Sequence, residues 1–313
     1  MNKTGLKQKR KTKLEQVLYL ANYAVKSRFS QKFKKPLICG FKITNKCNLK
    51  CSHCPFWREE KKELNFREVK DILIGLYNDG VRIVILEGGE PLLWKDSIED
   101  KNINDVVEFS KKLFFFIAVT TNGTIDLEDF NPDIFFISID GLEKTHDRIR
   151  GISFNKIIKN INKNKKNKKI IANICISKEN ISEITELVKF LNDKVFGITI
   201  QFFYPYENIL DLRVKSRQKE AIANELISLK KKGFKLLDST SCLKKMACSR
   251  WHCYDFLVSS VEPDGRLNYG CYLKNKVENV SCADCGFAAH CEISLAYSFN
   301  PGSLIAAKRI FWG

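Results

Sequence analysis

Apolar and polar residues follow two periodicities along the chain. From residue 37 to residue 203, short β-branched and aromatic runs, typical of buried strands, alternate with segments in which apolar residues recur every three or four positions. Six strands with intervening helices predict βαβ units and a parallel sheet, open or curled, with its chemistry at the carboxyl ends of the strands. The strand-like runs are Leu37–Thr44, Arg82–Leu86, Phe114–Thr120, Ile134–Ile139, Ile170–Ile176 and Ile198–Phe203, and the clearest helical segment is Phe66–Tyr77, with Gly80 as a stop signal.

The two ends of the chain differ from this middle part. Apolar residues at helical spacing predict an amphipathic helix over 13–29, and residues 1–35 carry eleven Lys/Arg but only one acid. Residues 211–232 have the pattern of a charged helix, and the chain is rich in cysteine from Cys242 onward. We therefore expect four segments, namely a basic N-terminal helix (1–35), an α/β core (36–206), a helical linker (207–240) and a small metal-stabilised module (241–313).

Composition narrows the class of protein. The 313 residues are 44% hydrophobic, which fits a globular chain, and they contain no run of 18 apolar residues and no signal-peptide pattern. We expect a cytoplasmic protein. Twelve cysteines in a reducing compartment favour metal or cluster ligation over disulfides.

The net charge of +17 suggests an anionic partner. RNA, a membrane surface and a phosphorylated substrate are the candidates, against a solvated lysine surface, which we favour for the seven-lysine run Lys156–Lys169. The N-terminal helix has two interpretations: it lies peripherally on the inner face of an anionic membrane, or it packs across the bottom of the core.

The first strand leads into a loop with the sequence ITNKCNLKCSHCPFW. It holds Cys47, Cys51 and Cys54 in a C-x3-C-x2-C arrangement. Three thiolates on one tight loop can hold three irons of a [4Fe–4S] cluster and leave the fourth iron open to a small molecule. Zinc loops and disulfide frameworks also use close cysteine pairs.

Further motifs stand at the ends of the next strands. Gly88-Gly89-Glu90-Pro91 follows the second strand, 34 residues after Cys54, and the two glycines allow close backbone approach. Thr120-Thr121-Asn122-Gly123 ends the third strand, and Ser138-Ile139-Asp140-Gly141 ends the fourth. Such groups suit ribose hydroxyls and a carboxylate, although Asn-Gly and Asp-Gly are also ordinary turn residues.

In combination, these motifs resemble the radical S-adenosylmethionine (radical SAM) superfamily over about residues 37–295. The resemblance implies a partial (β/α)6 TIM-type barrel in which SAM chelates the open iron, the GGEP turn holds its amino group, and the TNG and SIDG segments line its pocket. Asp140 to Gly151 is similar to a stretch in the SPASM-bearing and molybdopterin-enzyme-like branches. By this resemblance, His53 stands where the family has an aromatic residue against adenine. The other implied SAM-pocket residues are Gly88, Gly89, Glu90, Thr120, Asn122, Ser138, Asp140 and Arg150.

Nine cysteines lie outside the loop. Cys39 and Cys175 fall inside strand runs and are expected in the core. The C-terminal pattern resembles a SPASM or shorter "twitch" extension, but Leu295 stands where a full SPASM pattern has a cysteine. Seven cysteines are too few for two complete clusters, so one auxiliary [4Fe–4S] cluster is expected, with zinc as the alternative. The candidate ligands are Cys248, Cys253, Cys271, Cys282, Cys285 and Cys291.

The resemblance implies an enzyme that reductively cleaves SAM to a 5′-deoxyadenosyl radical, with electrons from a flavodoxin- or ferredoxin-type donor. The radical would abstract hydrogen from a substrate or add to it. The basic N-terminal helix favours a lipid or isoprenoid substrate slightly over a peptide or cofactor precursor. Two other classes stay open: a non-catalytic iron–sulfur electron carrier, which leaves GGEP and SIDG unexplained, and a zinc-dependent RNA-binding protein. We expect no nucleic-acid partner.

Overall fold

The computed structural model describes residues 10–60, 62–206 and 211–313. The first nine residues of the expected N-terminal segment and residues 207–210 of the expected linker lie outside the described residues. Within them, the strands are β1 (Ile38–Thr44), β2 (Ile83–Gly88), β3 (Lys95–Asp96), β4 (Lys101–Asn102), β5 (Phe116–Thr121), β6 (Ile134–Ser138), β7 (Ile170–Ile176), β8 (Gly197–Phe202), β9 (Val258–Val261) and β10 (Leu267–Tyr269). The α-helices are α1 (Lys13–Phe29), α2 (Phe66–Asn78), α3 (Ile103–Lys111), α4 (Glu143–Arg150), α5 (Phe154–Asn164), α6 (Ile184–Leu191), α7 (Ser216–Lys231), α8 (Thr240–Ala247), α9 (Ala288–Tyr297) and α10 (Pro301–Trp312).

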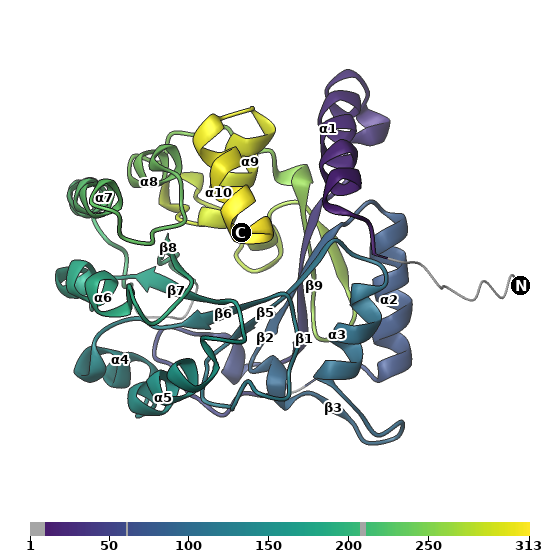
Figure 1. Cartoon of the computed structure of the whole chain (residues 1–313), viewed down its shortest axis with the longest axis horizontal. Helices are drawn as coiled ribbons and strands as arrows, with labels where there is room; N and C mark the ends of the chain where they lie inside the picture. Colours follow the sequence, from purple (N-terminus) through teal and green to yellow (C-terminus); the bar gives the residue numbers. More distant parts are fainter. Residues whose placement is uncertain (1–9, 61, 207–210) are drawn as a thin grey trace, which may run out of the picture.

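One curved sheet organises the molecule, with helices along its outer side (Figure 1). Its strand order is β10-β9-β1-β2-β5-β6-β7-β8, and β1, β2, β5, β6, β7 and β8 pair in parallel. These are the six strands that the sequence predicts, so the partial barrel is confirmed. Helix α2 begins as predicted, at an Asn65–Glu68 capping box that satisfies two otherwise unpaired backbone N–H groups.

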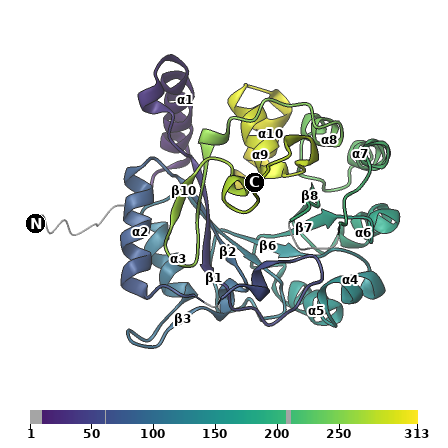
Figure 2. The same ribbon diagram turned by 180° about the vertical axis from the view of Figure 1, so that it is seen from behind.

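The sheet continues beyond the expected core. Strand β9, from the cysteine-rich end of the chain, pairs in parallel with β1, and β10 pairs antiparallel with β9. Figure 2 shows this hairpin beside β1 and β2. Short strands flanked by turns give a weak periodic signal, and the sequence did not predict them. The 241–313 segment therefore shares its hydrogen bonding with the core, and the boundaries of the four expected segments stay a prediction.

The two faces of the sheet differ in chemistry. Alternate residues of β1, namely Cys39, Phe41 and Ile43, are fully buried in the helix-side core. On the opposite, inner face, the half of the sheet near the amino ends of the strands is apolar, because Ile310 and Phe311 of α10 pack there against residues of β5, β6 and β7. The end of α10 thus fills this half of the barrel and leaves the half near the strands' carboxyl ends for the site.

Helix α1 has the predicted bounds and packs across the bottom of the core, which is one of its two interpretations, but its apolar stripe faces outward. Its buried residues are the polar Gln16 and Ser27, whereas Leu14, Leu18 and Phe29 of its apolar stripe are 69%, 59% and 86% exposed. The helix is attached instead by Tyr19, whose ring meets Phe115 edge-on, and by hydrogen bonds to α9 and α10. The sequence pattern locates the stripe correctly but does not show which face the rest of the chain covers. No helix among the described residues has the length and apolar character needed to cross a membrane.

Candidate active site

The three loop cysteines stand together where β1 ends. Cys51 is buried, and Cys47 and Cys54 are half-buried. The loop is tightened by two backbone groups: the Leu49 N–H donates to Cys47 Sγ at 3.4 Å, and the Cys54 N–H donates to the Cys51 carbonyl at 3.3 Å. The structure thus brings the predicted cluster ligands near one another at the carboxyl edge of the sheet.

The electrostatics of these thiols fit a cationic cluster. Burial raises the pKa of all three thiols, that of Cys51 to about 11, and repulsion from the Cys47 and Cys54 thiolates raises the pKa of Cys51 further. Buried thiols at such spacing do not ionise readily without a positive partner, because two or three negative charges would stay uncompensated. Iron ligated by the three thiolates supplies that charge, so the residues present fit an iron–sulfur cluster.

The GGEP turn holds the base of this loop. A Cβ on Gly88 would lie 2.3 Å from the Thr44 carbonyl oxygen, and a Cβ on Gly89 would lie 2.3 Å from that of Lys46. Gly88 also has a φ of 134°, which side chains rarely allow. The glycines are therefore required because the end of β2 lies directly against the start of the cysteine loop.

Glu90 is fully buried and engaged by the protein. One carboxylate oxygen accepts hydrogen bonds from the Thr121 hydroxyl at 2.7 Å and the Leu92 N–H at 3.2 Å, and the other accepts from the Asn122 N–H at 2.8 Å. Burial raises the pKa of Glu90 to about 7, against the opposing effect of these donors. The side chain ties the GGEP turn to the TTNG turn. Thr121, which the sequence did not single out, is the hydroxyl partner; its adjacency to Thr120 was the only signal.

Asn122 connects the third strand to the cysteine loop. Its amide Nδ2 donates to Asn48 Oδ1 at 2.8 Å and lies 3.9 Å from Cys47 Sγ. Thr120 precedes it on β5 and is half-buried. The TTNG turn therefore positions Cys47 as well as facing the expected cofactor pocket.

A buried ion pair stands beside Cys51. Arg150 Nε donates to Asp140 Oδ2 at 2.5 Å, and Arg150 Nη1 lies 4.0 Å from Cys51 Sγ. The side chains of Asp140 and Arg150 are 2% and 12% exposed. Burial opposes ionisation of Asp140, but the Arg150 cation holds the pKa of this carboxyl below its ordinary value. Arg150 is thus the permanent positive charge next to the buried thiol.

His53 lies on the other side of this pair. Its Nε2 is 3.7 Å from Asp140 Oδ2, and its ring meets that of Phe203 edge-on. Burial, together with the nearby Arg150 cation, lowers the pKa of His53 to about 4, so the imidazole is neutral. A neutral, half-buried ring at this position suits stacking on an adenine.

Cys175 departs from expectation. Cys39 is in the helix-side core as predicted, but Cys175 is half-buried and outside that core. Its backbone N–H donates to Asp140 Oδ1 at 2.9 Å. The alternation of β7 explains the difference, since Ile174 and Ile176 occupy the helix side and Cys175 takes the inner face with the half-buried Ser138 of β6.

Charged residues that the sequence did not indicate line the inner face near the cysteine loop. Lys42 of β1 pairs with Glu262 at 2.9 Å, and Lys276 reaches the same carboxylate at 2.8 Å. The Glu87 carboxylate of β2 lies over Gly40. In the sequence, Lys42 is a single polar residue within an apolar strand. The fold shows that its ion-pair partner, Glu262, lies 220 residues further along the chain.

Four of the C-terminal cysteines form a second group. Burial raises the thiol pKa of Cys253, Cys271 and Cys285, that of Cys285 to about 12, and repulsion from neighbouring thiolates of the group, Cys282 among them, raises these pKa values further. Such mutual repulsion arises only between near neighbours. Cys285 is buried, and Tyr204 and Phe287 stack nearby.

Two expected auxiliary ligands are not in this group. Cys248 is half-buried, and its Sγ donates to the Lys245 carbonyl at 3.7 Å. Cys291 is fully buried on α9 and contacts Cys242 of α8 instead. The C-x2-C-x5-C spacing does not show this, because α9 begins between Cys285 and Cys291 and turns the last thiol away.

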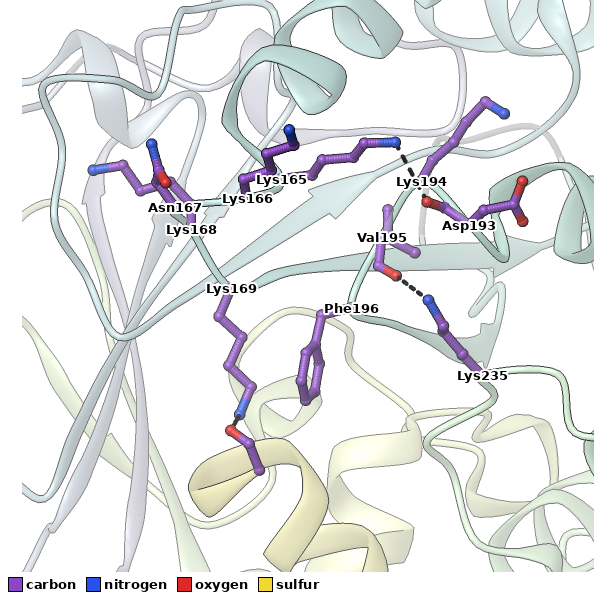
Figure 3. Close-up of a pocket in the computed structure, with 11 residues that line it drawn as sticks. Lys165, Lys166, Asn167, Lys168, Lys169, Asp193, Lys194, Val195, Phe196 and Lys235 are labelled. Carbon is purple, nitrogen blue, oxygen red and sulfur yellow. Dashed lines mark hydrogen bonds between the residues drawn. The ribbon is translucent and has the colours of Figure 1, made fainter.

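The lysine run forms a hollow at the opposite edge of the sheet. This hollow, of about 460 Å³, lies at the amino ends of β7 and β8, away from the cysteine loop (Figure 3). Lys169 donates to the carbonyls of Arg309 and Gly313, and Lys235 donates to that of Val195. These lysines bind backbone carbonyls at element ends, in agreement with a solvated structural surface.

Comparison with known families adds to this geometry. Residues 41–191 match the family model described as "Radical SAM superfamily". Residues 41–191 form a radical SAM domain. In this family a [4Fe–4S] cluster and SAM are the cofactors, and the buried loop thiols described above fit that cluster.

Relatives and solved structures agree with the assignment of this domain. The chain is 25% identical to the Fe-coproporphyrin III synthase of Methanosarcina barkeri over 52% of its own length and 42% of the relative. It is 30% identical to the antilisterial bacteriocin subtilosin biosynthesis protein AlbA of Bacillus subtilis, over 44% and 33%. It thus spans less than half of each relative. The structure of Streptococcus suis SuiB bound to precursor peptide SuiA has the same fold, with a TM-score of 0.65 at 16% identity, over 90% of this chain and 70% of that one.

Proposed function

We propose that this protein is a radical SAM enzyme whose Cys47, Cys51 and Cys54 hold the SAM-binding [4Fe–4S] cluster. The observation that carries the proposal is the gathering of three thiols, one buried and two half-buried, beside the GGEP and TTNG turns and the Asp140–Arg150 pair. When bound, the cluster and SAM supply one-electron cleavage of SAM and a radical that attacks a C–H bond or a double bond. A one-electron donor of the flavodoxin or ferredoxin type would be the partner.

The chain's own residues bind and orient in this proposal. Glu90 keeps the GGEP backbone fixed, so that its free polar groups face the methionyl end of SAM. Asn122 and Ser138 present polar groups to the rest of the cofactor, and His53 offers a neutral ring to adenine. Arg150 stabilises the Cys51 thiolate, because its cation is held close by Asp140.

We propose that one auxiliary [4Fe–4S] cluster is bound by four cysteine ligands, Cys253, Cys271, Cys282 and Cys285. Four thiols that repel one another match the ligand number of a complete cluster. Zinc bound by the same four thiolates is the alternative.

We infer a peptide substrate rather than a lipid. The inner face beside the cysteine loop carries the half-buried Glu87 carboxylate, which a bound isoprenoid chain would cover without offering it a hydrogen bond. A peptide offers polar groups to this carboxylate. AlbA is by name a bacteriocin biosynthesis protein, and SuiB has been solved with a precursor peptide, which supports this class.

Metal analysis and electron paramagnetic resonance test the enzyme assignment. Anaerobically reconstituted wild type should hold about eight irons per chain, and the Cys47/Cys51/Cys54 triple-Ala variant about four. Only the reduced wild type should show a SAM-perturbed signal and release methionine. The matched Cys285→Ala variant should lose auxiliary iron but retain SAM cleavage. SAM cleavage by the triple variant would overturn the assignment, and an iron-free, zinc-loaded Cys285 group would replace the auxiliary cluster by zinc.

Substrate class is tested by coupling. Peptides with charged side chains should raise the rate of methionine release, whereas a polyprenyl diphosphate should leave it unchanged. Stimulation by the diphosphate alone would return the substrate to the lipid class.

The exposed stripe of α1 supports a further proposal about location. Leu14, Leu18 and Phe29 face outward beside the exposed Lys13 and Lys26. An apolar stripe flanked by cations is complementary to an anionic lipid surface. We propose that α1 makes peripheral contact with such a membrane.

A further inference from the structure

A second set of metal-ligand side chains lies between α8 and α9, apart from both cysteine groups. Ligand atoms of Asp238, Cys242 and Glu292 all lie within 4.8 Å of one another. The thiol of Cys291 contacts that of Cys242, and Cys291 Sγ lies 4.0 Å from the Cys242 carbonyl oxygen. Two carboxyl groups and the Cys242 thiol therefore converge from the turn before α8, from α8 and from α9, and the Cys291 thiol of α9 lies beside Cys242 at the edge of this set.

Burial separates this set from an ordinary acidic surface. Asp238 is 2% exposed, and Cys242 and Cys291 are 0% exposed. Asp238 Oδ2 accepts a hydrogen bond from the Ile200 N–H of β8 at 2.7 Å, and Glu292 Oε1 accepts from the Ser239 N–H. Glu292 Oε2 is buried without any hydrogen-bond partner. A carboxylate oxygen in that state costs free energy unless something positive meets it.

Protein cations do not supply that charge. Lys230 is near enough to interact electrostatically with Asp238 and Glu292, but its Nζ donates a hydrogen bond to the Leu236 carbonyl. Among the described ranges, no lysine or arginine nitrogen lies within the 4.0 Å ion-pair limit of either carboxylate. Two buried carboxyl groups this close together can both be ionised only where a cation compensates them, and a bound divalent ion would do so.

We propose that Asp238, Cys242, Cys291 and Glu292 bind one divalent transition-metal ion, with Zn²⁺ as the expected occupant. Two sulfur and two oxygen ligands suit tetrahedral zinc, whereas magnesium and calcium take oxygen ligands only. With zinc–ligand bonds of about 2.0–2.3 Å, tetrahedral ligand atoms lie about 3.3–3.8 Å apart, so Asp238, Cys242 and Glu292 would move together by roughly 1 Å and the Cys291 thiol would rotate toward them.

The ion would have a structural role. It would join α8 to α9 and, through Asp238 and Ile200, both helices to β8. The segment that it would hold includes Gly286, which packs directly on Phe202 of β8 next to Cys285. The inference stands apart from the enzyme proposal, because none of its four ligands belongs to the loop cluster or to the Cys285 group. It also accounts for Cys291, which the cluster spacing leaves unexplained.

Zinc analysis of the holoprotein tests the site without any activity measurement. Protein expressed with added zinc and then reconstituted with iron and sulfide is analysed for zinc and iron by mass spectrometry after chelator washing. Wild type should retain about one zinc per chain. Cys242→Ser should lose the zinc while its iron content stays unchanged. Glu292→Gln is a milder, conservative change that should leave the protein folded, and it should lower zinc retention at least about tenfold.

Two controls separate the possible outcomes. Cys39→Ala removes an equally buried cysteine and should keep the zinc, and Cys285→Ala should change iron but not this zinc. Three results would each overturn the proposal. The first is a wild type without zinc, and the second is zinc that is lost in Cys285→Ala but retained in Cys242→Ser. The third is a Cys242–Cys291 disulfide, found by mass spectrometry of alkylated protein.

Discussion

At the scale of single residues, charges near the cysteine loop are compensated in pairs. Arg150 serves both the Asp140 carboxylate and the Cys51 thiol, and Glu90 is held by three donors. The Asp140–Arg150 pair is nearly inaccessible to water, so solvent cannot replace either partner. The loss in free energy of unfolding caused by a substitution at this site therefore depends on which charged partner is left unpaired.

Arg150→Ala should destabilise the protein by about 3–5 kcal/mol, because Asp140 would stay charged and buried without its partner. The double variant Asp140→Asn/Arg150→Met should lose less, since no unpaired charge remains. Urea unfolding of the cluster-free protein measures both. If the double variant were less stable than Arg150→Ala, the pairing argument would fail.

At the scale of elements, the GGEP turn and the cysteine loop behave as one unit. Gly89 lies so close to the Lys46 carbonyl that a methyl group has no space, and the obstacle is backbone rather than a flexible side chain. The loop geometry thus depends on the turn that begins at Gly88, 34 residues after Cys54.

Gly89→Ala should displace the cysteine loop and remove about four irons per chain, while the Cys285 group keeps its own. Gly75→Ala is the matched control, because a Cβ there has no neighbour within 4 Å and alanine favours the helix by about 0.5–1 kcal/mol. Iron and sulfide analysis gives the result. Full iron loading in Gly89→Ala would show that the contact is not required.

At the scale of the whole molecule, the N-terminal helix carries a stripe of apolar side chains that the rest of the described chain leaves exposed. Leu14 and Phe29 project from a helix attached through polar and aromatic contacts. Such a stripe next to lysines should give binding that depends on both lipid charge and salt.

Wild type should sediment with vesicles that contain phosphatidylserine, less so as salt rises, and poorly with neutral vesicles. Leu14→Ser/Phe29→Ser should reduce sedimentation at least about tenfold, since apolar burial supplies much of the affinity. Ile98→Ser/Ile152→Ser removes two exposed apolar side chains elsewhere and should have no effect. Equal losses in both double variants would exclude a specific role for α1.

The sequence was most informative where spacing follows a regular period. Strong 2- and 3.6-residue patterns located the six parallel strands and α2, and the motif order located the loop thiols, Glu90 and Asp140 near one edge. Contacts between distant segments carry no such period. The Lys42–Glu262 pair, the β1–β9 pairing, the inner-face position of Cys175 and the contact of Cys291 with Cys242 all required the fold. The ligand roles themselves stay predictions until metal analysis.

The pairing of β9 with β1 also sets an order of events during synthesis. A ribosome makes β1 more than 200 residues before β9, so one edge of β1 stays without its neighbour through most of translation. An unpaired strand edge is a site for association with other chains. The nascent chain therefore depends on fast local βα assembly, or on protection by a chaperone, until residues 258–261 emerge and complete the sheet beside the cysteine loop.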